Sequence, residues 1–271
     1  MKASSFAYAK PRSLPEVFDL LERHGDAARV LAGGQSLIPS LNMRLSEPGI
    51  LVDITGLPLK DISRTDGALH IGALVTHAEI EKSEEIKKSA PLLAEAVPHI
   101  AHAAIRNRGT IGGSLALADP AAEYPACVLA LNATLVATGR KGERRIRASD
   151  FFKSLYETDL RAGEVLTAVE IPVQRKDERS AFLELARRQG DYAIVGLAAF
   201  KGAETRFAFM NVGPVPVLAR KASSQPSVEK AKKALAEDLD PPADLYHSPQ
   251  AKLHLAGVLL ERAWNQLSTS R

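Results

Sequence analysis

Two glycine pairs with polar neighbours are the residues of this sequence best suited to chemistry: AGGQSL at residues 32–37 and TIGGS at residues 110–114. Glycine reaches positive φ without penalty and has no side chain to keep a ligand away from the backbone. Successive N–H groups in such a turn form a concave anion-binding site, called a nest, and a helix that begins directly afterwards favours negative charge further. Two opposed nests would hold the two charged groups of a diphosphate, so a dinucleotide cofactor is the natural candidate.

Neither glycine segment matches a standard nucleotide-binding motif. No Lys-Ser/Thr pair follows, as a Walker A loop requires, and the spacing differs from the G-x-G-x-x-G pattern of the Rossmann fold. Each pair also fits a tight strand-to-helix turn that binds nothing. From the residues alone, both interpretations stay open.

Other kinds of chemistry have little support in the sequence. The single cysteine, Cys127, excludes an intramolecular disulfide and any Cys-ligated zinc or iron–sulfur site built from this chain alone. His99 and His102 share one face of a predicted helix, but no third ligand follows at a recognisable spacing, which favours ordinary helix residues. No nucleophile elbow or paired-carboxylate motif is present. This inventory suits a protein whose cofactor carries the chemistry.

Caps and periodicity predict the elements that position the glycine pairs. Ser13 and Glu16 make a capping box that begins a helix, and Gly25 is placed to end it; Thr76 and Glu79 make a second box. A short buried strand, ARVLA, precedes the first glycine pair, and TDG marks the turn of a hairpin over residues 59–72. The remaining elements expected in this half are a helix from Leu37, a strand at 49–54, helices at 89–105 (interrupted at Pro98) and 121–131, and strands at 133–138, 144–148 and 164–173.

A charged break, QRKDERS at residues 174–180, separates this half from the rest of the chain. Three strands are predicted beyond it, at 181–187, 194–200 and 205–212, followed by helices at 227–237 and 249–266. The mixture of strands and helices predicts an α+β fold. We expect a first domain over residues 1–173 and a small α+β domain with a three-stranded antiparallel sheet over residues 180–271.

Composition bounds the function further. The chain has 271 residues, of which 45% are hydrophobic and 25% charged, and a net charge of +3. Basic residues are spread along the chain and form no stripe with interleaved aromatics, which argues against nucleic-acid binding. The N-terminus lacks the apolar region of a signal peptide, and no apolar run approaches the length of a transmembrane helix. These features predict a soluble, cytoplasmic protein.

Four segments carry a resemblance to a known family. AGGQSLIPSLNMRL, IRNRGTIGGSLALADPAAEYPA, GEVLTAVEIP and ARRQGDYAIVGLAA occur in the family's order and extend over nearly the whole chain. They resemble the FAD-binding medium subunit of molybdenum hydroxylases, a family that includes the carbon monoxide dehydrogenase medium subunit and the flavin domain of xanthine dehydrogenase. The resemblance implies a PCMH-type FAD-binding domain in two subdomains, with their boundary near residues 56–60.

The resemblance also implies a set of FAD-binding residues. Glu123 matches a carboxylate that hydrogen-bonds the cofactor, Ile100 and Leu166 match positions at the adenine end, and Tyr192 falls beside the isoalloxazine, where it would gate access to the ring. The diphosphate would be held by backbone and hydroxyl donors of Ala32, Gly33, Gly34, Gln35, Ser36 and Leu37, and of Thr110, Ile111, Gly112, Gly113 and Ser114.

By the same resemblance, the chain is an electron-transfer subunit. It would receive electrons from [2Fe–2S] clusters on a small partner subunit and pass them through FAD to an external acceptor. A large partner subunit would carry molybdopterin, and the complex would be a dimer of heterotrimers. Three alternatives stay open: a free-standing FAD-dependent oxidoreductase of the same fold superfamily, a flavin-free scaffold subunit, and a phosphate-binding module for another nucleotide.

Overall fold

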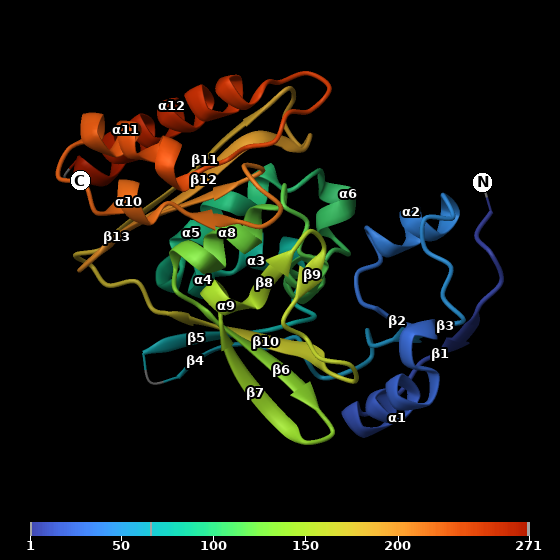
Figure 1. Cartoon of the computed structure of the whole chain (residues 1–271). Helices are drawn as coiled ribbons and strands as arrows, with labels where there is room; N and C mark the ends of the chain where they lie inside the picture. Colours follow the sequence, from blue (N-terminus) through green and yellow to red (C-terminus); the bar gives the residue numbers. More distant parts are fainter. Residues whose placement is uncertain (1, 66, 270–271) are drawn as a thin grey trace.

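The computed structural model describes residues 2–65 and 67–269 and has the predicted α+β architecture, in which three parts follow one another along the chain (Figure 1). The first part is a small parallel sheet of order β1–β3–β2, made of β1 (Ala7–Ala9), β2 (Ala28–Leu31) and β3 (Ile50–Asp53). Helices α1 (Leu14–His24) and α2 (Leu37–Asn42) accompany it, with a 3₁₀ turn, η1 (Gly25–Ala27), after α1. This part has its own apolar core around Val17, Val52 and Leu57.

Helix α1 begins and ends where the sequence predicts. The Glu16 N–H donates to Ser13 Oγ (3.4 Å), as in a standard capping box. The Glu16 carboxylate accepts a hydrogen bond from the N–H of Arg12 (2.8 Å), where a standard box would use the N–H of Ser13. Gly25, with φ of +48°, ends the helix, and its N–H donates a hydrogen bond to the carbonyl oxygen of Leu21. The box at Thr76 and Glu79 has both of its predicted hydrogen bonds.

The second part is built on a five-stranded antiparallel sheet of order β4–β5–β10–β6–β7. Its strands are β4 (Ile62–Thr65), β5 (Ala68–Gly72), β6 (Thr134–Gly139), β7 (Gly142–Arg147) and β10 (Val165–Pro172). β4 and β5 form the expected hairpin, although Asp66 of the TDG turn lies outside the described residues. A small hairpin, β8 (Phe152–Ser154) and β9 (Glu157–Thr158), follows the short helix α9 (Ala148–Phe151).

Between β5 and β6 the chain forms a series of short helices. They are α3 (His77–Lys82), α4 (Glu84–Ser89), α5 (Pro91–Ala96), η2 (Val97–His99), α6 (Ala103–Arg106), α7 (Ile111–Leu117) and α8 (Glu123–Ala130). The predicted interruption at Pro98 of the helix over residues 89–105 is confirmed, but the chain also leaves the helix at Ala90 and at residues 100–102. Ala90 is non-helical, Pro91 begins a new helix, and Pro98 lies in a 3₁₀ turn, because proline suits the first turn of a helix but not its interior.

The third part carries an antiparallel sheet of four strands where the sequence predicts three. β11 (Arg179–Ala186), β12 (Ala193–Lys201) and β13 (Thr205–Met210) are the expected strands, and β14 (Val217–Leu218) pairs with β13. β14 has only two residues and directly follows Pro216, so no alternating pattern could indicate it. Helices α10 (Arg220–Ser223), α11 (Val228–Asp238) and α12 (Pro249–Ser268) complete this part.

Helix α8 joins the second and third parts. All eight of its residues are buried, as expected for a helix that is apolar on all sides. One continuous core contains Cys127 and Leu129 of α8 together with Phe182 of β11 and Met210 of β13. The other face of the β11–β14 sheet packs on α11 and α12, which lie at the top of Figure 1.

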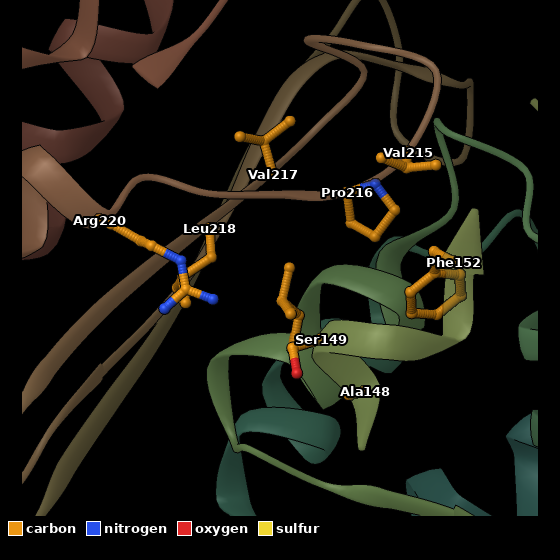
Figure 2. Close-up of a pocket in the computed structure, with 9 residues that line it drawn as sticks. Ala148, Ser149, Phe152, Val215, Pro216, Val217, Leu218 and Arg220 are labelled. Atoms are coloured by element: carbon orange, nitrogen blue, oxygen red, sulfur yellow. The ribbon is translucent and has the colours of Figure 1, made fainter. Parts of the chain in front are cut away.

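A pocket of about 210 Å³ lies at the edge of this junction, between α9 and the segment around β14 (Figure 2). Apolar side chains such as Phe152 and Val217 line it, with Arg220 at one side. No residue of either glycine segment lines this pocket. Among the described residues, no helix has the length and apolarity needed to cross a membrane.

Candidate functional site

The two glycine segments lie in direct contact, although about 75 residues separate them. A Cβ atom at Gly33 would lie 2.3 Å from the carbonyl oxygen of Arg108 and 2.7 Å from the Cα atom of Gly109. Any side chain at residue 33 would therefore push the segments apart. Farther along, a Cβ atom at Gly113 would lie 3.9 Å from that of Ala32. The sequence prediction that these segments act together thus has a geometric basis.

In the first segment, the backbone donors are free. The N–H groups of residues 33–37 donate to no atom of the residues that the structure describes. Gly34 has a φ of +73°, whereas Gly33 does not lie in the left-handed region. At Gly33, close contact with Arg108 is therefore what excludes a side chain, and not the backbone conformation. Helix α2 has only six residues, so the exposed N–H groups, more than a helix dipole, suit this segment to an anion.

In the second segment, the backbone donors are already used. Thr110 is the N-cap of α7, and Gly112 and Gly113 lie inside the helix. A Cβ atom at Gly112 would lie 2.4 Å from that of Ala73, so glycine here permits close packing of α7 on the end of β5. All four backbone N–H groups of residues 111–114 donate hydrogen bonds of 2.9–3.1 Å. Those of Ile111 and Gly112 donate to the carbonyl oxygens of Val75 and Ala73, respectively. Those of Gly113 and Ser114 donate to the hydroxyl and the carbonyl oxygen of Thr110, respectively.

This segment is thus a helix N-terminus, not the open nest that the glycine pair suggested. The hydroxyl groups of Thr110 and Ser114 are the donors that it can offer to a ligand. The two segments therefore contribute differently, one through its backbone and the other through its side chains.

His77 contacts Gly109, which directly precedes the second segment. The backbone N–H of His77 donates to the Gly109 carbonyl (2.9 Å), and a Cβ atom at Gly109 would lie 2.7 Å from the His77 imidazole ring. Burial, with a smaller contribution from Arg106, lowers the pKa of His77 to about 4, so the ring is neutral at pH 7. Arg106 pairs with Glu81 (3.1 Å), so its side chain has a structural partner beside the second segment.

Glu123, the first residue of α8, is 9% exposed. Burial, with smaller contributions from the negative charges of Glu184 and Asp119, raises its pKa to about 8. No lysine, arginine or histidine of the described residues lies within ion-pair distance of this carboxyl. Glu123 is therefore largely protonated at neutral pH and is able to donate a hydrogen bond as well as accept one.

Tyr192, in the loop between β11 and β12, is 74% exposed. Gly190 anchors this loop, because its φ is +83° and a Cβ atom there would lie 2.6 Å from the carbonyl oxygen of Ala101. Desolvation, followed by the charges of Asp119 and Glu123, raises the pKa of Tyr192. The exposed phenol thus lies near the carboxyl that the sequence assigned to the same cofactor.

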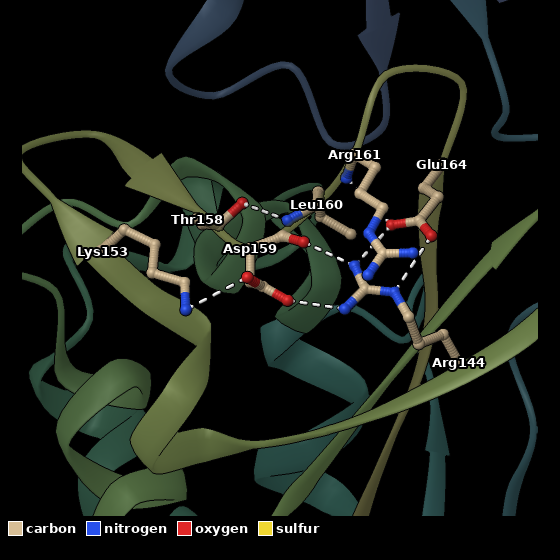
Figure 3. A network of polar contacts seen from close by, with 7 residues as sticks. All are labelled: Arg144, Lys153, Thr158, Asp159, Leu160, Arg161 and Glu164. Atoms are coloured by element: carbon tan, nitrogen blue, oxygen red, sulfur yellow. Dashed lines mark hydrogen bonds and ion pairs between the residues drawn. The ribbon is translucent and has the colours of Figure 1, made fainter.

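Sequence analysis missed Tyr156 and Asp119. Tyr156 lies at the tip of the β8–β9 hairpin with a φ of +57°, and desolvation, Asp119 and Tyr192 raise its pKa. Figure 3 shows what fixes this hairpin: Arg144 donates to Asp159 (2.5 Å) and to Glu164 (2.7 Å). A lone tyrosine in a turn carries no sequence signal, because its neighbours come from other elements.

Ile100 and Leu166 are both buried in the central core. Leu166 lies beside a bulge where the pairing of β10 with β6 shifts register. A contact of either residue with an adenine ring stays a prediction.

Comparison with known proteins identifies the family. Residues 4–174 match the family described as FAD binding domain in molybdopterin dehydrogenase, and residues 180–267 match the CO dehydrogenase flavoprotein C-terminal domain. The chain belongs to this flavoprotein family. It is an FAD-binding medium subunit of the molybdenum hydroxylase class, in which the relatives are subunits of oxidoreductase complexes.

Relatives of this flavoprotein match it over almost their whole length. The 6-hydroxypseudooxynicotine dehydrogenase complex subunit alpha of Paenarthrobacter nicotinovorans is 37% identical, over 97% of this chain and 94% of the relative. A chain of carbon monoxide dehydrogenase from Hydrogenophaga pseudoflava superimposes with a TM-score of 0.94 at 33% identity, covering 98% of both chains. A chain of quinoline 2-oxidoreductase from Pseudomonas putida 86 gives 0.91 at 39% identity, again covering 98% of both chains.

The residues of the flavoprotein fit FAD. Five consecutive N–H groups without protein partners suit the anionic diphosphate, and the close contact at Gly33 leaves the backbone there open to a ligand. Glu123 places a buried carboxyl at the start of α8. Bound FAD supplies the redox chemistry, while the protein binds, orients and shields it.

Proposed function

We propose that this chain transfers electrons within a multi-subunit molybdenum hydroxylase. In this proposal it accepts electrons from [2Fe–2S] clusters of a small partner subunit onto FAD and passes them to an external acceptor. A large partner subunit carries the molybdopterin site at which the substrate is hydroxylated. The complex is a dimer of heterotrimers in the cytoplasm.

The observation that carries the proposal is the row of free N–H donors at residues 33–37, held against the second glycine segment by the contact at Gly33. The site residues follow from it. Residues 32–37 hold the diphosphate through the backbone, while Thr110 and Ser114 hold it through hydroxyl groups; Glu123 hydrogen-bonds the cofactor and Tyr192 lies beside the isoalloxazine. Ile100 and Leu166 are assigned to the adenine end.

The inventory of residues supports a division of labour among subunits. With one buried cysteine, the chain has no ligand set of its own for an iron–sulfur cluster. A flavin held by such a chain receives its electrons from another protein. The relative from Paenarthrobacter nicotinovorans is, by its name, a subunit of a dehydrogenase complex.

The proposal includes a division of the chain into two domains. The FAD-binding domain spans residues 1–173, with its subdomain boundary near residues 56–60, and the C-terminal domain spans residues 180–271. The gap between β3, which ends at Asp53, and β4, which begins at Ile62, agrees with the first boundary.

An experiment on the purified chain tests the proposal. The full chain should show the visible absorbance of a flavin, and acid precipitation should release all of it, because neither glycine segment contains a His or Cys that could form a covalent link. Co-expression with candidate partner subunits should give a complex in which substrate reduces the flavin. Turnover of an organic substrate by the chain alone would favour a free-standing oxidoreductase instead.

A further inference from the structure

His77, the first residue of α3, has a buried side chain that the proposed site does not use. The residue is 5% exposed, and its Nδ1 atom is fully buried with no hydrogen-bond partner among the described residues. The centroid of its ring lies 5.3 Å from that of Tyr124, whose hydroxyl is also buried and has no partner in the described part of the chain. Buried polar atoms without hydrogen bonds lower stability, so packing alone gives no reason for a histidine at this position.

The imidazole ring of His77 is neutral at pH 7. Burial, followed by the positive charge of Arg106, lowers its pKa to about 4. Arg106 pairs with Glu81 (3.1 Å), and Glu79 of the same helix accepts hydrogen bonds from the N–H and the hydroxyl of Thr76 (2.7 Å). Within residues 2–65 and 67–269, no carboxylate makes an ion pair with His77. The ring therefore acts through its shape and position and not through charge.

Gly109 is the residue that His77 holds in place. The backbone N–H of His77 donates to the Gly109 carbonyl (2.9 Å), and the N–H of Gly109 donates to the carbonyl oxygen of Ile105 (2.8 Å). A Cβ atom at Gly109 would lie 2.7 Å from both Cδ2 and Nε2 of the His77 ring. The neighbouring residues Thr76 and Thr110 form an isolated β-bridge. Both polar backbone groups of Gly109 are thus fixed, and the ring fills the space beside its Cα atom.

Gly109 also touches the first glycine segment. A Cβ atom at Gly33 would lie 2.7 Å from the Cα atom of Gly109 and 2.3 Å from the carbonyl oxygen of Arg108. One residue therefore contacts both His77 and Gly33. The free N–H groups of residues 33–37 begin at this contact. Any shift of Gly109 into the space of the His77 ring changes the support of Gly33, and with it the position of these donors.

We propose that His77 is a positioning residue of the FAD site: its buried ring holds Gly109 against Gly33 and so fixes the backbone donors of residues 33–37. This inference rests on the proposed FAD site, and the effect of His77 on FAD passes through Gly109. The contact has a specific consequence for substitutions. A methyl group added at Gly109 collides with the ring, whereas the same methyl group fills part of the space that the ring leaves when His77 is truncated.

The first test concerns the full chain without FAD. Far-UV circular dichroism gives the thermal midpoints of the wild type, His77→Ala, Gly109→Ala and the double variant. Residues in contact have non-additive effects, so Gly109→Ala should lower the midpoint less in the His77→Ala background than in the wild type. The control is Leu267→Ala, because Leu267 is buried in the separate core between the C-terminal sheet and α12; its effect should add to that of Gly109→Ala.

The second test measures the dissociation constant of FAD at pH 7, from the change in FAD fluorescence on binding, at a temperature where every variant is folded. His77→Ala and Gly109→Ala should each raise this constant about tenfold, the loss expected when a hydrogen bond to a charged group is weakened. The double variant should bind FAD about threefold more tightly than Gly109→Ala. Leu267→Ala should bind FAD as the wild type does, although its thermal midpoint is lower, which separates positioning from general stability.

Wild-type affinity for FAD in His77→Ala overturns the positioning role and leaves the proposed function intact. Additive effects of His77→Ala and Gly109→Ala in both tests also overturn it. Failure of the wild type to bind FAD overturns the positioning role and the proposed function together. If Gly109→Ala does not fold, FAD affinity in His77→Ala, compared with Leu267→Ala, decides the proposal: weaker binding in His77→Ala alone supports it, and equal binding in the two variants overturns it.

Discussion

At the scale of single residues, the site depends on what certain positions lack. Gly33 has no side chain, so the backbone around it touches Arg108 and Gly109 and the N–H groups that follow stay exposed. Among the described residues, no lysine or arginine makes an ion pair with Glu123 or Glu184, and burial raises the pKa of both carboxyl groups. Neither property is visible from the residue type alone, because each depends on a neighbour distant in the sequence.

Gly33→Ala is expected to abolish most FAD binding while far-UV circular dichroism stays close to that of the wild type. The new methyl group would lie 2.3 Å from a backbone oxygen, so the two glycine segments must separate. Flavin absorbance per mole of purified protein measures the effect. The control is Gly56→Ala, where the nearest atom to the new Cβ is a lysine side-chain carbon at 3.5 Å; it should keep its flavin. Full flavin content in Gly33→Ala would show that the contact does not shape the site.

At the scale of elements, two sets of contacts hold the parts of the site in place. Helix α7 packs Gly112 on the end of β5, with Thr110 as its N-cap. Arg144 of β7 ties the β8–β9 hairpin to the start of β10 through Asp159 and Glu164, and so holds Tyr156 in place (Figure 3). Because these contacts join elements far apart in the sequence, the glycine pair predicted a nest where the fold uses a helix.

Arg144→Met should lower the free energy of unfolding by about 1–2 kcal/mol, because charge-assisted hydrogen bonds to two partly buried carboxylates are lost. Arg144 is 23% exposed, whereas its neighbour Arg145 is 59% exposed. Arg145→Met is therefore the matched control, with an expected loss below about 1 kcal/mol. Urea denaturation at pH 7 measures both. Equal losses in the two variants would assign no special role to the Arg144 network.

The same network has a defined pH dependence. Hydrogen bonds from Arg144 hold the pKa of Asp159 and of Glu164 below their usual values. Their contribution is therefore complete above the usual pKa values of 3.8 and 4.5 and is lost as the pH falls through the lower values of the folded state. The stability difference between Arg144→Met and the wild type should thus shrink below pH 3.8. A difference that stays constant down to pH 2 would contradict this origin.

At the scale of the whole molecule, the sequence predicted the elements better than their contacts. The α+β class, the two end helices and the main strands follow from caps and alternating apolar residues such as those of β10 and β12. The two-residue strand β14 carries no such pattern. The core that α8 shares with β11 and β13 results from packing between elements, which no local pattern encodes.

The shared core predicts that the two domains unfold together. Trp264 is the only tryptophan and stacks on Phe207 in the C-terminal domain, at 6.1 Å between ring centroids. Its fluorescence and the flavin absorbance should therefore report the same thermal midpoint, because Phe182 and Met210 continue the core of the FAD-binding domain. A flavin that is released well below the tryptophan transition, while the far-UV signal falls in two steps, would indicate independent domains.

The last prediction concerns assembly. Three large side chains with apolar surface are exposed on the β8–β9 hairpin and in the loop between β11 and β12: Leu155, Tyr156 and Tyr192. Exposed groups of this kind mark interaction sites more often than chance would, and a flavin that receives electrons from a partner must lie near the surface that the partner covers. We expect an interface above about 1,600 Å² of total buried area in the complete complex. Amide hydrogen exchange in peptides that contain residues 155–156 and 192 should slow on assembly with the partner subunits, while exchange in α11, on the far side of the C-terminal sheet, stays the same. Unchanged exchange at both tyrosines would place the partner elsewhere, and a chain that never co-purifies with a molybdenum-containing subunit would remove the basis for the proposed function.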